Sequence, residues 1–334
     1  MIPSDRKTWQ TMMERQPVEA PERLSTREYK KLSEAAQNEN RQRRIEFLCN
    51  EHLLHTPDLD RLLEAGRKTL IRNGFPSNVA RTGLAISGPS TVGKSSTILE
   101  IGRRHHRKEM QGASGWDNFM PTAYVSFGMA HTPKMALMAL ARFLGLTFAT
   151  RTNTMDIGEA TVAVLNQLGT SLIIVDEVHN MSGVRHQDTE GAAGTLKWLT
   201  EHVNATFILA GIDLPNSALF TGTIGAQFGG RFNIYTMEPF SNNSAKEREA
   251  WKKLVATFES YLLGVLMEHE SGSLADVSDE IFKVPLSPTV ETYSLPHSIG
   301  TLKELLVSAA LTAIMTGKEK VTVGDLARVF NRAA

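Results

Sequence analysis

Residues 84–96 read Leu84-Ala85-Ile86-Ser87-Gly88-Pro89-Ser90-Thr91-Val92-Gly93-Lys94-Ser95-Ser96. A run of small apolar residues leads into a loop bounded by two glycines, and the loop satisfies the pattern G-x-x-x-x-G-K-[ST] at every fixed position. The two glycines let such a loop fold around an anion without Cβ clashes, so that its N–H groups point inward. A helix that begins near Lys94 would place its positive dipole end on the same anion. The pattern predicts a nucleotide site at the end of a strand.

The side chains of this loop suit ATP and Mg²⁺. Lys94 is expected to reach the β- and γ-phosphates and to take part in catalysis, and the Ser95 hydroxyl is expected to take one position on the metal. The rest of the loop is expected to bind the nucleotide through Gly88, Pro89, Ser90, Thr91, Val92, Gly93 and Ser96.

A second apolar run, Ser171-Leu172-Ile173-Ile174-Val175-Asp176-Glu177, ends on two carboxylates. Its β-branched and aliphatic residues are typical of a strand that is buried on both faces of a parallel sheet. Buried acids without a partner are costly, so their position at the end of a strand indicates a site. Asp176 is expected to hold Mg²⁺, directly or through water, and Glu177 to orient and polarise the attacking water.

The wider pattern alternates strands with helices. Between the two apolar runs the sequence predicts helices over 94–104, 134–144 and 157–168 and a strand over 124–127. After them it predicts a polar insert over 181–193, a helix over 195–202, a strand over 206–211, a glycine-rich loop over 222–230 and a last strand over 231–237. The fold class that follows is α/β, with a parallel sheet flanked by helices.

The sequence divides into three segments. Residues 1–46 are polar and predict short helices on an extension that is mobile unless a partner holds it. Residues 47–238 predict the α/β nucleotide-binding domain, in which a helix from Pro57 to about Asn73 precedes the strand that leads into the phosphate loop. Residues 239–334 predict a small C-terminal helical lid, with helices over 246–266, 301–316 and 323–331.

Two basic clusters leave two interpretations open. Arg41 to Arg44 suits either a solvated helix face or a contact with phosphate. Arg103 to Lys108 follows the predicted helix, where cations are favoured by the helix dipole, and it also suits a contact with DNA.

Composition narrows the class of protein. Lys and Arg number 36 and so do Asp and Glu, so any DNA contact must come from a local patch. The single cysteine, Cys49, excludes an intrachain disulfide and suits a reducing compartment. We see no 18-residue apolar run and no apolar segment at the N-terminus, so the sequence predicts a cytoplasmic protein without a membrane span.

With these residues placed, the chain resembles the AAA+ ATPases carried by transposons, the transposition regulators of the TniB/TnsC type. The resemblance covers about residue 55 to the C-terminus. It rests on His55-Thr56-Pro57, on Ile173-Ile174-Val175-Asp176-Glu177-Val178-His179-Asn180, on Leu196-Lys197-Trp198-Leu199, on Leu209-Ala210-Gly211 and on Gln227-Phe228-Gly229-Gly230-Arg231-Phe232. The phosphate loop is shared by many ATPases and adds little.

The resemblance implies an oligomeric ATPase with the ATP site at each subunit interface. Arg231 then matches the arginine finger, which reaches the γ-phosphate of the neighbouring subunit, and Lys303 matches the sensor position of the lid, where an arginine is usual. A lysine keeps the charge but loses the bidentate contact. Ile212 stands where the family carries a polar residue, so either Asp213 substitutes for it or the polar sensor is absent and hydrolysis is slow.

The resemblance also implies binding along double-stranded DNA as a ring or a helical filament. Such proteins connect a target-selector protein of the TniQ/TnsD type to the transposase. Their DNA contacts go to phosphates, and the residues that match are Lys134, Arg151 and Thr152, which are otherwise ordinary surface polar residues.

Two other functions compete with this one. A helicase-loader or protein-remodelling AAA+ ATPase would carry the same nucleotide site without coating DNA. A helicase is suggested by Asp176-Glu177-Val178-His179, but fewer than 100 residues follow Met237, which leaves no room for a second motor domain.

Overall fold

The computed structural model describes residues 3–75, 81–111, 119–128, 132–181, 186–217, 219–284 and 297–331. The chain forms two compact units. The first contains Met1–Arg15, Pro57–Pro89 and Gly93–Met237, and the second contains Gln16–Thr56, Ser90–Val92 and Glu238–Ala334. The predicted N-terminal extension, residues 1–46, is therefore shared between the two units.

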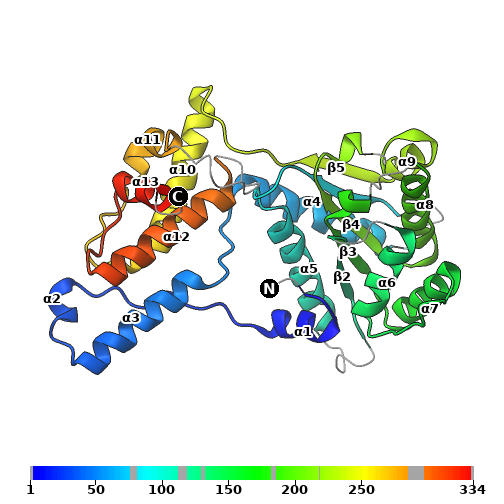
Figure 1. Ribbon diagram of the computed structural model, residues 1–334, viewed down its shortest axis with the longest axis horizontal. Coiled ribbons are helices and arrows are strands. Elements are labelled where there is room, and N and C mark those ends of the chain that lie inside the picture. Colours follow the sequence, from blue (N-terminus) through cyan, green and yellow to red (C-terminus); the bar gives the residue numbers. More distant parts are fainter. Residues whose placement is uncertain are drawn as a thin grey trace. The chain divides into compact units, whose positions relative to one another are not determined.

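The first unit is built on a five-stranded parallel sheet with the strand order β2-β3-β4-β1-β5 (Figure 1). Every residue of β1, β3 and β4 is buried, as expected for central strands covered on both faces. The predicted α/β fold class is confirmed. The strands are β1 (Gly83–Ser87), β2 (Thr122–Ser126), β3 (Leu172–Asp176), β4 (Thr206–Gly211) and β5 (Phe232–Thr236).

Helices cover both faces of this sheet. One face carries α4 (Pro57–Asn73) and α5 (Lys94–Met110), and the N-terminal helix α1 (Arg6–Glu14) packs on α5 (Figure 1). The other face carries α6 (Pro133–Phe143), α7 (Thr154–Gln167) and α8 (His186–His202). Two short 3₁₀ turns, η1 (Val178–Met181) and η2 (Leu214–Asn216), follow β3 and β4.

Part of the region after β3 is more helical than predicted. The glycine-rich segment, predicted as a loop, contains the helix α9 (Gly222–Gly229). Glycines disfavour a helix, but Phe228 is wholly buried and packs on Phe220 and Phe232, so tertiary packing outweighs propensity. The predicted insert, 181–193, contributes the first turns of α8 from His186 onward, and residues 182–185 lie outside the described residues.

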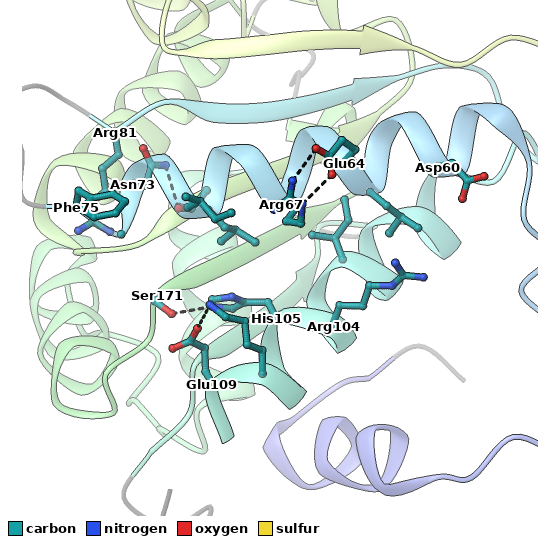
Figure 2. A pocket seen from close by; sticks show the side chains of 17 residues that line it. Asp60, Glu64, Arg67, Asn73, Phe75, Arg81, Arg104, His105, Glu109 and Ser171 are labelled. Atoms are coloured by element: carbon teal, nitrogen blue, oxygen red, sulfur yellow. Dashed lines mark hydrogen bonds and ion pairs between the residues drawn. The ribbon is translucent and has the colours of Figure 1, made fainter. Parts of the chain in front are cut away.

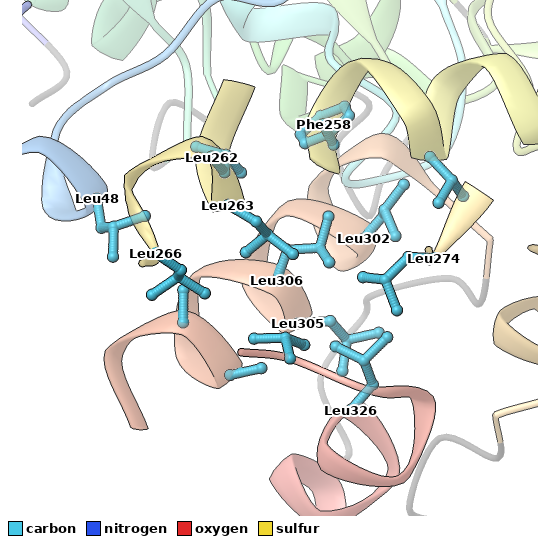
Figure 3. Close-up of a cluster of buried hydrophobic side chains, with 14 of the residues drawn as sticks. Leu48, Phe258, Leu262, Leu263, Leu266, Leu274, Leu302, Leu305, Leu306 and Leu326 are labelled. Carbon is cyan, nitrogen blue, oxygen red and sulfur yellow. The ribbon is translucent and has the colours of Figure 1, made fainter. Parts of the chain in front are cut away.

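The second unit is helical. The longest apolar helix, α12, contributes a row of side chains to its core, and α3, α10 and α13 pack around this row (Figure 3). Its elements are α2 (Thr26–Tyr29), α3 (Glu34–Cys49), α10 (Ala245–Leu262), η3 (Leu263–Val265), η4 (Ala275–Val277), α11 (Ser278–Phe282), α12 (Ile299–Thr316) and α13 (Val323–Asn331).

The N-terminal segment is packed, which corrects the prediction of a mobile extension. Trp9 of α1 is wholly buried in the first unit. Arg44 of α3, which we predicted on a solvated face or against phosphate, is 2% exposed and forms an ion pair with Glu319 at 2.6 Å in the second unit. A buried guanidinium needs such a partner, and that partner is 275 residues away in the sequence.

Helix α12 is long and apolar enough to cross a membrane by length and composition, with a mean hydropathy of 1.4. The sequence predicted no membrane span. Leu302, Leu306 and Ala310 of this helix are buried in the core of the second unit, so its apolar character is explained by packing.

Candidate nucleotide site

The glycine-bounded loop has the backbone that its motif predicts. Gly93 has a φ of +102°, a left-handed conformation that favours glycine, and it stands directly before the first turn of α5. The Thr97 hydroxyl donates a hydrogen bond to the Gly93 carbonyl at 2.9 Å, and the Gly88 N–H donates to the Gly211 carbonyl at 3.2 Å. The loop is thereby held between β1, β4 and the start of α5.

Lys94 is buried at the start of α5. Its Nζ donates to the Pro89 carbonyl at 2.6 Å, and the residue is 6% exposed. Burial lowers the pKa of Lys94, and the nearby carboxylates of Glu177 and Asp176 oppose this shift. The structure therefore brings the predicted lysine and the two predicted acids into one electrostatic environment.

Sheet topology explains why these groups meet. β4 lies between β1 and β3, with Ser87 opposite Gly211 and Val175 opposite Leu209. All three strands are parallel, so the loop after β1 and the acids at the end of β3 lie at the same carboxyl edge.

The two acids have different environments. Asp176 is 1% exposed, its Oδ1 accepts the Glu177 N–H at 2.8 Å, and its Oδ2 accepts the Tyr124 hydroxyl at 3.2 Å. The Glu177 side chain is 39% exposed, and its backbone has a φ of +55°, which is costly for a residue with a Cβ. The strained backbone accompanies a carboxylate that points out of the core, where a water could reach it.

His179 is a neighbour of Glu177 and lies outside the set of predicted site residues. Its Nδ1 lies 3.2 Å from the Ile212 N–H, which can only donate, so the other ring nitrogen carries the proton in the neutral form. That nitrogen, Nε2, lies 3.5 Å from Glu177 Oε2. Burial lowers the pKa of His179 and favours this neutral form. The Asp-Glu-x-His spacing was the signal that could have identified it.

The donor set fits Mg²⁺. A serine hydroxyl and a carboxylate are hard oxygen ligands, as this ion prefers, and Asp176 has no ion-pair partner within the described ranges. No group of three His, Cys, Asp or Glu residues that could hold a metal is found among the residues that the structure describes. A Mg²⁺ ion held by Ser95 and Asp176 would complete its shell with phosphate oxygens and water.

Two further predicted residues of the first unit are engaged within their own chain. Arg231, directly before β5, forms an ion pair with Glu201 at 2.8 Å and also donates to the Thr200 hydroxyl at 3.3 Å. Asp213 is exposed, has a φ of +46° and accepts a hydrogen bond from Asn216 at 2.8 Å. Asp213 thus stabilises the turn η2 in this structure.

Other predicted residues belong to the second unit. Lys303 of α12 lies half-buried, where burial lowers its pKa and the carboxylate of Glu51 opposes the shift. Ser90, Thr91 and Val92, the tip of the loop, are also grouped with this unit. The Gly300 N–H donates to the Thr91 carbonyl at 2.9 Å.

The two segments that carry the three predicted DNA contacts lie next to each other. Lys134, near the start of α6, donates from its Nζ to the carbonyl of Thr150 at 3.0 Å. The structure thereby brings Lys134 next to the segment that carries Arg151 and Thr152, which precedes α7. We call Lys134, Arg151 and Thr152 the basic patch.

The basic cluster Arg103 to Lys108 lies within α5, which continues to Met110 and does not end near Arg104 as predicted. Arg103 and Arg104 both pair with Glu100, Arg107 donates to the Met13 carbonyl, and His106 is 1% exposed. Most of these side chains therefore have partners inside the chain.

One described cavity lies away from this site. It has a volume of about 660 Å³ and opens between α4 and α5 (Figure 2). Ser171 and Thr206, at the amino ends of β3 and β4, form part of its wall, and its charged residues include the Arg67–Glu64 pair. The cavity thus faces the edge of the sheet opposite to the phosphate loop.

Comparison with known proteins agrees with this geometry. The family described as Bacterial TniB protein matches residues 44–242. The Aeropyrum pernix ORC2 protein, in ADPNP–ADP complexes, is 16% identical with a TM-score of 0.60, covering 86% of this chain and 71% of that chain. The Aeropyrum pernix ORC1 protein in complex with DNA is 13% identical with a TM-score of 0.59, covering 85% and 66%.

Domain III of the Thermotoga maritima replication initiation protein DnaA is 13% identical with a TM-score of 0.52, covering 84% of this chain and 94% of that domain. A search of curated proteins gave no match. At these identities the structural likeness shows the fold, which is that of the AAA+ P-loop ATPases.

Proposed function

This chain belongs to the family of bacterial TniB proteins and is an AAA+ ATPase, and we propose that it is an ATP-dependent DNA-binding regulator of transposition. One observation carries the proposal: the phosphate loop and the Asp176–Glu177 pair meet at one edge of the sheet in a chain of this family. Its expected setting is the reducing cytoplasm.

In this proposal each side chain of the nucleotide site has a separate role. Lys94 leaves the Pro89 carbonyl and binds the β- and γ-phosphates, because phosphate oxygens are stronger acceptors for an ammonium. Ser95 and Asp176 hold Mg²⁺, which neutralises phosphate charge when it is bound. Glu177 orients and polarises the attacking water, and His179 restrains the Glu177 carboxylate.

The proposed partners are further copies of this chain, double-stranded DNA, a target selector of the TniQ/TnsD type and a transposase. Arg231 is proposed as the arginine finger toward the neighbouring copy, and Lys303 as a nucleotide contact of the lid. The basic patch is proposed to contact DNA phosphates. Support comes from its local clustering and from the ORC1 relative, which is described in complex with DNA.

A helicase-loader or protein-remodelling ATPase is the second candidate. The likeness to replication proteins, including ORC and DnaA, favours it, as does a formal net charge of zero, which supplies no general attraction to DNA. This candidate predicts discrete complexes and no coating of long duplexes.

The deciding experiment mixes the full chain with a long duplex and either ATP, a non-hydrolysable analogue, ADP or no nucleotide. We expect regular assemblies by electron microscopy, and retention of labelled DNA, only with ATP or the analogue. Lys94→Ala should abolish both, because it removes the main phosphate contact, whereas the exposed Lys68→Ala on α4 serves as the matched control. Discrete complexes, or no retention at low salt, would favour the second candidate.

The basic patch is tested in the same assay. Replacing both Lys134 and Arg151 by alanine should weaken DNA retention for all sequences alike. The slope of the logarithm of DNA affinity against the logarithm of salt concentration should become shallower by about one for each residue replaced. The same ATP hydrolysis rate without DNA would show that the nucleotide site is intact.

A further inference from the structure

A buried chain of side chains links the N-terminal helix to the acid at the end of β3. It begins at Trp9 of α1 and passes through Tyr124 of β2 to Asp176 at the end of β3. All three belong to the first unit, and their exposed fractions are 0%, 0% and 1%. The predicted role of Asp176 is to hold Mg²⁺, so this inference rests on the proposed function.

Trp9 is seated by its neighbours on α5. Its indole Nε1 donates to His106 Nδ1 at 3.3 Å, and its six-membered ring lies over Gly102, where a Cβ would come within 2.9 Å of the ring. A side chain at residue 102 would therefore displace the indole. Helix α1 itself is fixed by a capping box between Asp5 and Thr8.

Trp9 in turn stacks on Tyr124. The two rings are 6.1 Å apart between centroids and only 14° from parallel. Aromatic pairs in this arrangement restrict each other in addition to burying apolar surface. Removal of the indole would leave the Tyr124 ring free to tilt within β2.

Tyr124 fixes the orientation of the Asp176 carboxylate. The tyrosine hydroxyl donates to Oδ2 at 3.2 Å, and the Glu177 N–H donates to Oδ1 at 2.8 Å. Each carboxylate oxygen has two lone pairs, so both hydrogen bonds leave a lone pair for another ligand. With one donor on each oxygen, the plane of the carboxylate is set from both sides.

We propose that Tyr124 is a positioning residue for Mg²⁺ binding at Asp176, and that the N-terminal helix controls it through Trp9. The Tyr124 hydroxyl orients the Asp176 carboxylate, and the Trp9 indole, which belongs to α1, restricts the Tyr124 ring. Displacement of α1 therefore weakens binding of the Mg²⁺–nucleotide complex without altering any residue that contacts the nucleotide.

The test measures nucleotide affinity with and without the metal. Fluorescent ADP is titrated with the full chain in Mg²⁺ and in EDTA, and the ratio of the two dissociation constants is the magnesium effect. Tyr124→Phe deletes only the hydroxyl, and it should reduce the magnesium effect by about tenfold while leaving the affinity in EDTA unchanged. Tyr235→Phe on β5, whose ring faces Arg61, is the matched control and should retain the wild-type ratio.

A double-mutant cycle separates this role from simple packing. Trp9→Ala should reduce the magnesium effect in the wild-type background and have no further effect on it in Tyr124→Phe, because the indole acts through the hydroxyl. Trp9→Phe, which keeps a ring, should retain most of the effect. Thermal unfolding of each variant shows that the fold is kept.

The outcomes are distinct. An unchanged ratio in Tyr124→Phe, or equal effects of Trp9→Ala in both backgrounds, overturns the inference and leaves the proposed nucleotide site intact. If wild-type protein itself shows no magnesium effect, the proposed metal site is wrong and this inference falls with it.

Discussion

Arg231 and Glu201 form an ion pair at 2.8 Å between the residue before β5 and the last turn of α8. The guanidinium side chain is 25% exposed and the carboxylate 41%, so the pair lies at the surface of the first unit. A surface ion pair is worth little, about 1 kcal/mol or less, so a phosphate from a neighbouring copy can displace Glu201. The proposed role of Arg231 as an arginine finger can therefore be tested by changing either partner of this ion pair.

We predict that Arg231→Ala removes hydrolysis only in the assembled state. Because the proposed finger acts on the neighbouring copy, mixing Arg231→Ala with Glu177→Gln should restore part of the lost activity. In such mixed assemblies, an Arg231→Ala subunit keeps its own acids and receives the arginine of a Glu177→Gln neighbour. The measurement is the ATPase rate as a function of the mixing ratio. Pure Arg231→Ala should lose about 10³-fold or more of the assembled rate, as is typical of arginine fingers.

Arg67→Ala is the control for this series, since Arg67 is an exposed arginine in a similar ion pair with Glu64. Glu201→Gln should keep or raise the assembled rate because it frees the guanidinium. A mixture that shows only the average of the two inactive proteins would contradict a finger acting in trans.

Glu177→Gln should bind ATP and hardly hydrolyse it. The amide keeps the size of the side chain but cannot accept the proton of the attacking water, so the turnover rate should fall by about 10²- to 10⁴-fold. Single-turnover hydrolysis and binding of fluorescent ATP measure the two effects separately. A variant that hydrolyses at the normal rate would remove Glu177 from this role.

His179 is predicted to affect turnover more than binding. His179→Ala deletes the side chain between the Ile212 N–H and Glu177, so the carboxylate loses a restraint and the turnover rate should fall by about tenfold. His179→Asn can still accept a hydrogen bond and should recover part of the rate. Equal rates in both variants, with a changed ATP affinity, would indicate a different role.

Acid should destabilise the first unit through His106. Burial lowers the pKa of His106 to about 4, whereas an unfolded histidine titrates near 6.5. Between pH 6.5 and 4 the unfolded state binds more protons, so the stability contributed by this residue is complete above pH 6.5 and is lost as the pH falls through that window. The full shift corresponds to about 3 kcal/mol.

Urea unfolding near pH 7 and near pH 5 checks this prediction in wild type and in His106→Gln. Glutamine does not titrate, so on acidification the free energy of unfolding should fall less in the variant than in wild type. The difference between the two decreases should be about 2 kcal/mol. Parallel changes in the two proteins would show that His106 does not govern the acid response.

The phosphate loop and the strand that ends at Asp176 could be predicted from the sequence, because each is encoded by residues that are adjacent in the chain. The strands over 84–87, 172–176 and 206–211 could be located from apolar runs alone, since central strands of a parallel sheet are buried on both faces. The helix α9 was missed because its glycines disfavour a helix and only the packing of Phe228 stabilises it.

The sequence by itself determined the α/β class, the nucleotide loop at residues 88–96 and the acids at 176 and 177, because local spacing encodes them. Only the tertiary structure decided that Trp9 stacks on Tyr124 beside Asp176, that Arg44 is buried against Glu319, and that Lys134 lies next to Thr150. These contacts join residues far apart in the chain. Burial and pairing at such distances depend on how the elements pack, and no local pattern of residue types specifies that.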